Sequence, residues 1–256
     1  MTDICIIGSG NVAGALALRI AEIEELHLVG IAARNERQGR SVAQSARCEW
    51  SWPEIPAAEL YIAAVKDDAI GEVCSLAGIA AEATVVHTSG CVAVDEIGRK
   101  NAGVIYPLQS FSAKACTDWN AVPLFIEWTS ERARKTVECT ASLLSPNVRR
   151  LDSAARARLH LAGVMANNFT NLMYAASERI MKDAGLPFGL LMPMIEGSVR
   201  KMAAGLSPAE IQSGPAVRGD VSTQGRHLAL LHENYPEYEK TYEILSRLIW
   251  ETLRKT

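Results

Sequence analysis

A glycine-rich turn near the start of the chain constrains the fold more than any other feature. The apolar residues 4–7 lead into Gly8-Ser9-Gly10-Asn11-Val12-Ala13, which fits the pattern G-x-G-x-x-[GA], and apolar residues then recur at helical spacing over residues 12–23. Strand, glycine turn and helix in this order form the context in which that pattern binds a dinucleotide pyrophosphate. We therefore predict a cofactor site over residues 8–12, the alternative being a glycine turn that holds no ligand.

The apolar runs that follow predict the fold class. Strands are expected at residues 26–33, 59–65, 83–87, 103–106, 123–128 and 148–151, with helices at residues 38–46 and 130–144 among them. This alternation is typical of a doubly wound, mostly parallel α/β sheet. Beyond residue 151 the pattern is helical, at residues 153–184, 187–204, 208–212, 221–231 and 236–255. We predict a Rossmann domain at residues 1–151 and an all-helical domain at residues 152–256, with Asp67, Asp152 or Ser153, and Asp220 as helix caps.

Charge and cysteine usage narrow the function classes. The net charge of the 256-residue chain is −3, which favours neither nucleic acid nor an anionic membrane as partner. Its six cysteines are scattered without C-x-x-C or metal-ligand spacing, so we expect reduced thiols and no metal site. The first strand leaves no room for a signal peptide, and no apolar run approaches ~18 residues. We expect a cytoplasmic protein.

The end of the second predicted strand indicates which dinucleotide is bound. NAD-binding folds place an acidic residue there for the ribose 2′-hydroxyl, whereas this chain has Arg34, followed by Asn35. A guanidinium matches a 2′-phosphate in charge and geometry, so we predict NADP rather than NAD. Val65 and Lys66, at the end of the strand over residues 59–65, are expected along the nicotinamide ribose. The alternative for Arg34 is a solvent-facing loop position.

A polar stripe marks the predicted long helix over residues 153–184. On a helical wheel, His160, Gly163, Asn167 and Asn171 lie opposite a broad apolar face, with Asn168 beside them. Asparagine costs a helix roughly 0.6 kcal/mol relative to alanine, so an ordinary solvent face would favour other residues. Such a stripe can bond to a partner helix, to ordered water or to a ligand, and we interpret it as a ligand or buried polar network.

Two further segments contain candidate substrate contacts. The strand over residues 83–87 ends in Thr88-Ser89-Gly90, at the carboxyl edge of the sheet where open α/β folds bind ligands. The loop over residues 214–220 carries Arg218 between small residues, where it either binds an anion or is merely exposed.

Five motifs together resemble one known family: residues 8–13, the Arg34 loop, and residues 106–111, 166–171 and 214–220. It is a bacterial family of NADP oxidoreductases with a Rossmann-like domain and a helical C-terminal domain of unknown function. The wider superfamily has C-terminal domains similar to 6-phosphogluconate dehydrogenase. It includes pyrroline-5-carboxylate reductase, ketopantoate reductase and deazaflavin-dependent NADP reductases. The resemblance implies an NADP-dependent reductase that forms a homodimer through its helical domain.

One departure from the superfamily affects the chemistry. Its β-hydroxyacid dehydrogenases carry G-x-x-x-K-x-x-x-N on the first long helix after the nucleotide domain, and this chain has Gly163, Asn167 and Asn171 at that spacing. An asparagine can orient a substrate but cannot deliver a proton. Those enzymes also carry a Ser-Gly pair at the sheet edge, which Ser89-Gly90 resembles.

Two functions remain open from the sequence. One is hydride transfer between NADPH and a small carbonyl, imine or deazaflavin-type acceptor; the other is a non-catalytic NADP-binding module, such as a sensor or a partner-dependent subunit. For the first we expect Asn167 and Asn171 to orient and polarise the substrate, and Ser89 to hydrogen-bond it. His160 is the candidate proton donor because histidine titrates near neutral pH, its alternative role being helix packing. The expected substrate contacts are Thr88, Asn168 and Arg218.

Overall fold

The computed structural model describes residues 1–112 and 116–253 of the chain. The chain forms two compact units, Met1–Ala166 and Asn167–Thr256, each of which is described by itself. The strands end near the predicted domain boundary at residue 151, and the first helix after it packs on the first unit.

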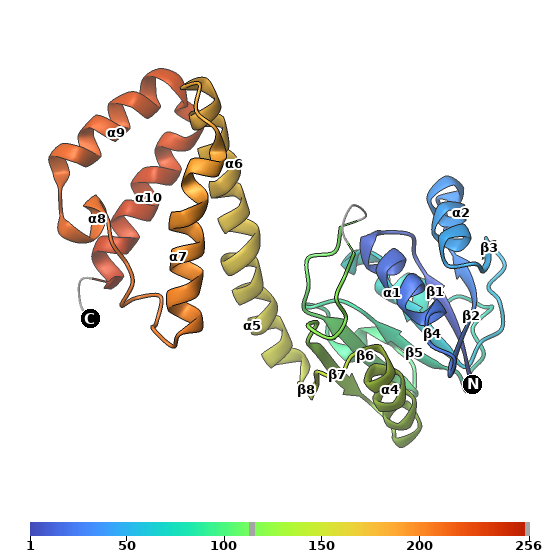
Figure 1. Cartoon of the computed structure of the whole chain (residues 1–256). Helices are drawn as coiled ribbons and strands as arrows, with labels where there is room; N and C mark the ends of the chain where they lie inside the picture. The colour runs from blue at the N-terminus through green and yellow to red at the C-terminus, as the bar shows by residue number, and fades with distance from the viewer. Residues whose placement is uncertain (113–115, 254–256) are drawn as a thin grey trace. The chain divides into compact units, whose positions relative to one another are not determined.

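The first unit is built on an eight-stranded sheet with the order β3-β2-β1-β4-β5-β6-β7-β8 (Figure 1). Every neighbouring pair is parallel except β6 and β7, which confirms the predicted doubly wound, mostly parallel sheet. The strands are β1 (Thr2–Ile7), β2 (Leu26–Ala32), β3 (Glu49–Ser51), β4 (Leu60–Ala63), β5 (Thr84–His87), β6 (Ala102–Pro107), β7 (Leu124–Trp128) and β8 (Val148–Arg150).

Helices cover both faces of this sheet because side chains alternate along each strand. Ile4 and Ile6 pack toward α1 (Asn11–Ala21), α2 (Glu36–Ser45) and α4 (Glu131–Leu144). Cys5 and Ile7 pack on the opposite face, toward α3 (Ile70–Cys74), which follows η1 (Asp67–Ala69), and toward η2 (Val94–Ile97). The central strands are apolar on both sides, as expected for a buried parallel sheet.

The helix α5 (Ser153–Gly163) is fixed to the sheet by a buried ion pair. The Asp152 side chain caps it by accepting a hydrogen bond from Ala155 N, which confirms one predicted cap. Arg156 is fully buried, and its Nη1 donates to Glu127 on β7 at 2.5 Å while its Nη2 donates to the Val92 carbonyl at 2.5 Å. The start of α5 therefore cannot shift without breaking a pair of buried charges.

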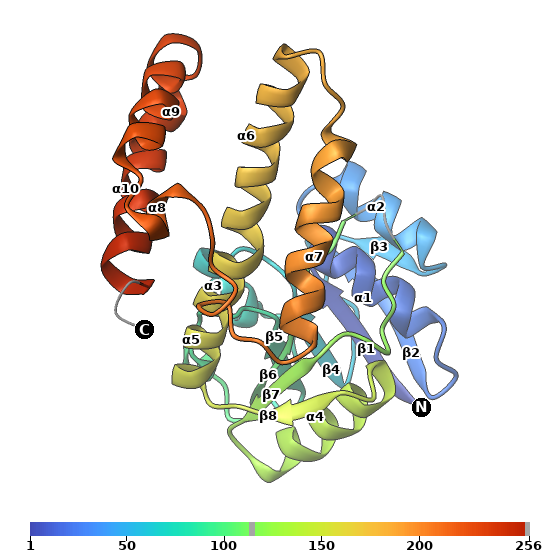
Figure 2. The same cartoon turned by 60° about the vertical axis from the view of Figure 1, so that its left-hand side comes forward.

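All regular elements in the described part of the second unit are helices, as predicted. Its elements are the end of η3 (Val164–Phe169), then α6 (Thr170–Asp183), η4 (Phe188–Leu191), α7 (Met192–Ala203), α8 (Pro215–Arg218), α9 (Val221–Asn234) and α10 (Pro236–Leu253). The helices α8 and α9 pack on α10, and Figure 2 shows α9 and α10 side by side. Arg179 of α6 forms an ion pair with Glu237 of α10. The predicted end of the last helix, residues 254 and 255, lies outside the described residues.

The predicted helical run over residues 153–184 is confirmed from Ser153 to Asp183, but it is not a single regular α-helix. Residues 164–169 are π-helical, so α5 and α6 are separate α-helical segments. A π turn takes an extra residue, and a wheel drawn at a constant 100° per residue does not carry across it. The polar stripe predicted from His160 to Asn171 therefore rests on a helical geometry that the chain does not have.

Three local predictions also need correction. Residues 208–211 form turns rather than a helix, and the loop over residues 214–220 contains the one-turn helix α8. Pro215 opens α8 and Gly219, at φ +67°, closes it, so Pro and Gly punctuate a helix here rather than a loop. Asp67 is not a cap, because Lys66 occupies that position and makes no side-chain bond. Asp220 does cap α9 through Thr223 N, as predicted.

We expect Arg156→Met to lower the unfolding free energy of the first unit by about 3–5 kcal/mol, because it leaves the Glu127 carboxylate buried without its counter-ion. Arg156→Met combined with Glu127→Leu should recover most of that loss, since both charges are then removed. Chemical denaturation of the full chain measures both effects. Arg134→Met, which breaks an exposed ion pair on α4, is the control and should change little. Equal stability of wild type and Arg156→Met would contradict this account.

Candidate active site

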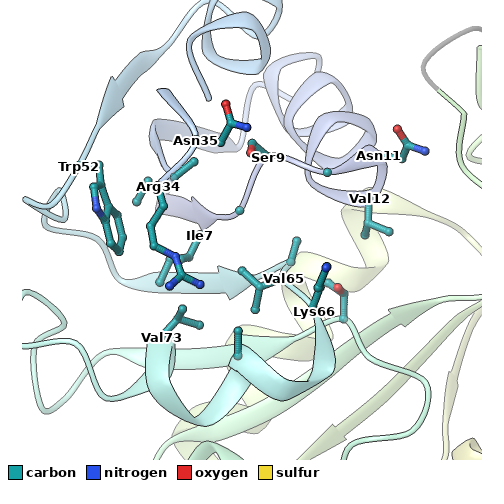
Figure 3. Close-up of a pocket in the computed structure, with 17 residues that line it drawn as sticks. Ile7, Ser9, Asn11, Val12, Arg34, Asn35, Trp52, Val65, Lys66 and Val73 are labelled. Carbon is teal, nitrogen blue, oxygen red and sulfur yellow. The ribbon is translucent and has the colours of Figure 1, made fainter. Parts of the chain in front are cut away.

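A cavity of about 530 Å³ opens at the carboxyl edge of the sheet, between the β1–α1 turn and the ends of β2 and β4 (Figure 3). The predicted cofactor residues all line it, together with the predicted substrate contact Thr88. The cofactor residues are Gly8, Ser9, Gly10, Asn11, Val12, Arg34, Asn35, Val65 and Lys66. Predicted residues from four separate segments of the sequence thus share one cavity.

The glycine turn fits a pyrophosphate. Gly8 has φ +131°, and a Cβ there would lie 2.2 Å from the Ala64 carbonyl oxygen, so only glycine can occupy this position. A Cβ at Gly10 would meet nothing within 4 Å, which leaves the backbone open to an incoming group. Gly10 caps α1 without a side-chain hydrogen bond, so the N–H groups of the first turn are available to a phosphate.

One end of the cavity holds a cation and an aromatic ring. Figure 3 shows Arg34 and Trp52 at this end, away from Asn11 and Lys66. The exposed Arg34 guanidinium lies 3.7 Å from Glu72, and the Asn35 side chain caps α2 by accepting from Gln38 N. No helix or strand was predicted for residues 47–58, so nothing in the sequence pattern pointed to Trp52 as part of the cavity lining.

A tight turn over residues 88–92 follows β5. Thr88 lines the cavity, and the Ser89 hydroxyl accepts hydrogen bonds from Cys91 N and Val92 N, each at 3.0 Å. Within the described residues the Ser89 hydroxyl accepts these two bonds and donates none, so its proton is available to a ligand.

His87 has a structural role in the same turn. It is fully buried, and its Nδ1 accepts from Ser89 N at 3.1 Å. Burial, aided by the positive charge of Arg156, lowers the pKa of His87 to about 4. The ring is therefore neutral near pH 7, and it is buried beneath the turn rather than exposed to a ligand.

His160 of α5 packs directly against this turn. Its Nδ1 lies 3.0 Å from the Tyr106 hydroxyl on β6, and the two rings meet edge to face with centroids 5.9 Å apart. A Cβ on Gly90 would lie 2.5 Å from the His160 ring, so the imidazole occupies space that only a glycine leaves open. The structure thus brings the candidate proton donor next to Gly90, two residues from Thr88 in the cavity lining.

The remaining predicted site residues belong to the second unit. Asn167, Asn168, Asn171 and Arg218 are all exposed there, with Asn167 and Asn168 in the π-helical segment. Their contacts with substrate stay predictions. The sequence analysis named Tyr106 only within the family motif over residues 106–111, so its contact with His160 was not predicted.

Comparison with known proteins assigns the family. Residues 3–89 match the family described as NADP oxidoreductase, coenzyme F420-dependent, and residues 122–249 match a domain of unknown function, DUF2520. A candidate NADP oxidoreductase from Bacteroides fragilis is 36% identical, with a TM-score of 0.89 over 98% of both chains. This chain belongs to that family of NADP oxidoreductases. Its cofactor is NADP, in agreement with Arg34 at the end of β2.

More distant structures share the fold. A protein from Thermotoga maritima is 22% identical, with a TM-score of 0.70 over 98% of both chains. The 1-pyrroline-5-carboxylate reductase of Streptococcus pyogenes is 12% identical, with a TM-score of 0.61 over 100% of this chain and 99% of that one. No curated protein sequence matches the chain. In the described residues, no helix is both long and apolar enough to cross a membrane.

We expect Arg34→Ala to weaken NADPH binding about tenfold or more while NADH binding stays the same, since only NADPH carries the 2′-phosphate. Glu72→Gln should strengthen NADPH binding, because it removes the carboxylate that competes for Arg34. Calorimetric titration of each variant with both cofactors measures the effect. Arg134→Ala, on a helix remote from the cavity lining, is the control. Equal losses for NADPH and NADH in Arg34→Ala would contradict this assignment.

Proposed function

We propose that this oxidoreductase uses NADPH to reduce a small carbonyl or imine compound. The observation that carries the proposal is the position of His160, which packs on Ser89-Gly90 where the turn leaves the cofactor cavity at Thr88. Related folds support the substrate class: a reductive aminase from Aspergillus terreus, solved with NADPH and ethyl levulinate, has a TM-score of 0.63 at 16% identity. An imine reductase from a Pseudomonas species has a TM-score of 0.60.

The chain's own residues supply what hydride transfer requires besides the cofactor. Bound NADPH supplies the hydride. The chain must hold the acceptor, polarise it and provide a proton for the oxygen or nitrogen that is reduced. Ser89 has a free hydroxyl proton for the first task, and His160 carries an exchangeable proton for the last. In this proposal Asn167 and Asn171 orient the acceptor, while Thr88, Asn168 and Arg218 contact the rest of it.

The test is an NADPH-oxidation screen against 2-keto acids, ketones with and without amines, cyclic imines, and oxidised flavin and deazaflavin. With the best acceptor, His160→Gln should lower kcat/KM by ~10²-fold or more, and Asn167→Ala by a similar factor, with NADPH affinity unchanged. His27→Gln is the matched control, because His27 is an exposed histidine of the same unit that pairs with Asp3.

Tight NADPH binding with no turnover on any acceptor would overturn the reductase proposal in favour of the non-catalytic module. Turnover only with deazaflavin would replace the substrate class. If Asn167→Ala is silent while His160→Gln is not, the role carried over from the superfamily to Asn167 is wrong.

We also propose a homodimer formed through the helical unit. Its described part buries few side chains, namely Ala176, Ala216, Leu231 and Tyr235. Large apolar side chains are instead exposed there, with Leu190 at 60%, Met194 at 67% and Val221 at 77%. A unit with so small a core and so much exposed apolar surface favours association with a second copy.

Light scattering at micromolar concentration should give the mass of a dimer. The double variant Leu190→Glu with Met194→Glu is expected to shift it toward the monomer, because both charges fall on exposed apolar positions of η4 and α7. Leu18→Glu is the control and should leave the mass unchanged, because Leu18 is also exposed, at 47%, but lies on α1 of the other unit. A monomeric wild-type protein would refute the proposal.

A further inference from the structure

Tyr106 makes a single side-chain hydrogen bond, and that bond goes to His160. The tyrosine is the last residue but one of strand β6 and is buried. Its hydroxyl lies 3.0 Å from His160 Nδ1 and has no other hydrogen-bond partner among the described residues. Burial raises the pKa of Tyr106, so the phenol keeps its proton at working pH. A protonated hydroxyl with one neighbouring acceptor donates to that acceptor, which here is the imidazole nitrogen.

The His160 ring is constrained from three directions. The Tyr106 hydroxyl holds Nδ1, the Tyr106 ring packs edge to face against the imidazole, and the Gly90 backbone closes a third side. One helical turn earlier, the buried pair of Arg156 with Glu127 fixes the backbone from which the imidazole projects. Nε2 makes no hydrogen bond within the described part of the chain, and His160 is only half-buried, so this nitrogen is free for a ligand.

We propose that Tyr106 is a positioning residue for His160: its hydroxyl donates to Nδ1, fixes the ring proton on Nε2, and thereby makes Nε2–H the group that meets the substrate. A neutral imidazole carries one proton, so a nitrogen that accepts a hydrogen bond leaves the proton on the other nitrogen. This inference rests on the proposed reductase function, in which His160 protonates the reduced acceptor.

The proton transfer then balances as a relay of two protons. As the acceptor oxygen or nitrogen gains negative charge, the Nε2–H bond breaks and the proton moves to that atom. Nδ1 takes the proton of the Tyr106 hydroxyl at the same time, so the ring stays neutral and changes tautomer. The tyrosinate left behind is a far weaker base than the alkoxide or amine anion that it replaces. Because its hydroxyl contacts His160, the reverse shift resets the pair: Nε2 takes a proton from solvent and Nδ1 returns its proton to Tyr106.

A second tyrosine–histidine pair in the chain provides a matched control. His227 Nδ1 lies 2.8 Å from the Tyr242 hydroxyl, with ring centroids 5.7 Å apart, nearly the same geometry as the first pair. This second pair is part of the helical unit and has no residue in the cofactor cavity. Removing the Tyr242 hydroxyl therefore changes the same chemistry without touching the proposed site.

The first measurement needs no substrate. In protein labelled with ¹⁵N-histidine, long-range correlation spectra above neutral pH report which nitrogen of each ring carries the proton, and His160→Gln identifies the His160 signals. We expect Nε2–H for His160, with an Nδ1 resonance that moves in Tyr106→Phe and stays in Tyr242→Phe. A proton on Nδ1 in the wild type, or an Nδ1 resonance unaffected by Tyr106→Phe, would overturn the inference even if the protein reduces its acceptor well.

The second measurement uses whichever acceptor the screen identifies. Tyr106→Phe should lower kcat by ~10²-fold while KM and NADPH affinity hold, and should have no further effect in His160→Gln. A proton inventory in mixed light and heavy water should change from two protons in flight to one. An additive loss in the double variant would overturn the relay. If no acceptor is reduced, the reductase proposal fails by itself, and the histidine spectra still decide the role of Tyr106.

Discussion

The buried pair of Arg156 and Glu127 is the interaction on which the rest of the candidate site depends. It joins the first turn of α5 to β7, and a second guanidinium bond reaches the Val92 carbonyl in the segment after the Ser89 turn. One charged side chain therefore fixes a helix, a strand and a loop relative to one another. Such a pair adds little net stability compared with apolar residues in the same positions. Removing one of its two charges is costly, however, because the other charge stays buried without a partner. His160 lies four residues further along α5, so the position of its backbone depends on this ion pair.

Much of the first unit could be predicted from the sequence because its rules are local. A strand buried on both faces appears as an apolar run, and Gly8 is specified by a backbone conformation and a contact that exclude a Cβ. The positions of Arg34, Val65 and Thr88 follow from the general rule that ligands meet the carboxyl ends of parallel strands. The polar stripe over residues 160–171 was predicted less well, because residues 164–169 adopt a π-helical hydrogen-bonding pattern that residue spacing alone does not reveal.

The pairing of Tyr106 with His160 shows why the chemistry was harder to predict than the fold. The two residues are 54 positions apart, and their contact depends on the register of β6 in the sheet and on the point where α5 crosses its edge. A pattern search finds His160 as a lone polar residue on a helix, for which packing and catalysis are both reasonable roles. Trp52 illustrates the same limit, because only the folded chain brings it beside Arg34.

The turn after β5 assigns different tasks to two histidines that lie close together. His87 is fully buried in the turn, where desolvation and the charge of Arg156 lower its pKa and keep it neutral. Its Nδ1 accepts a hydrogen bond from Ser89 N. His160 lies on the open side of the same turn, over Gly90, with one nitrogen held and the other free. A larger residue at position 90 would displace the second imidazole, and a charged His87 would face Arg156 in a medium that screens poorly. In the proposed mechanism His160 is the histidine of this turn that offers a proton to the substrate, while His87 has a purely structural role.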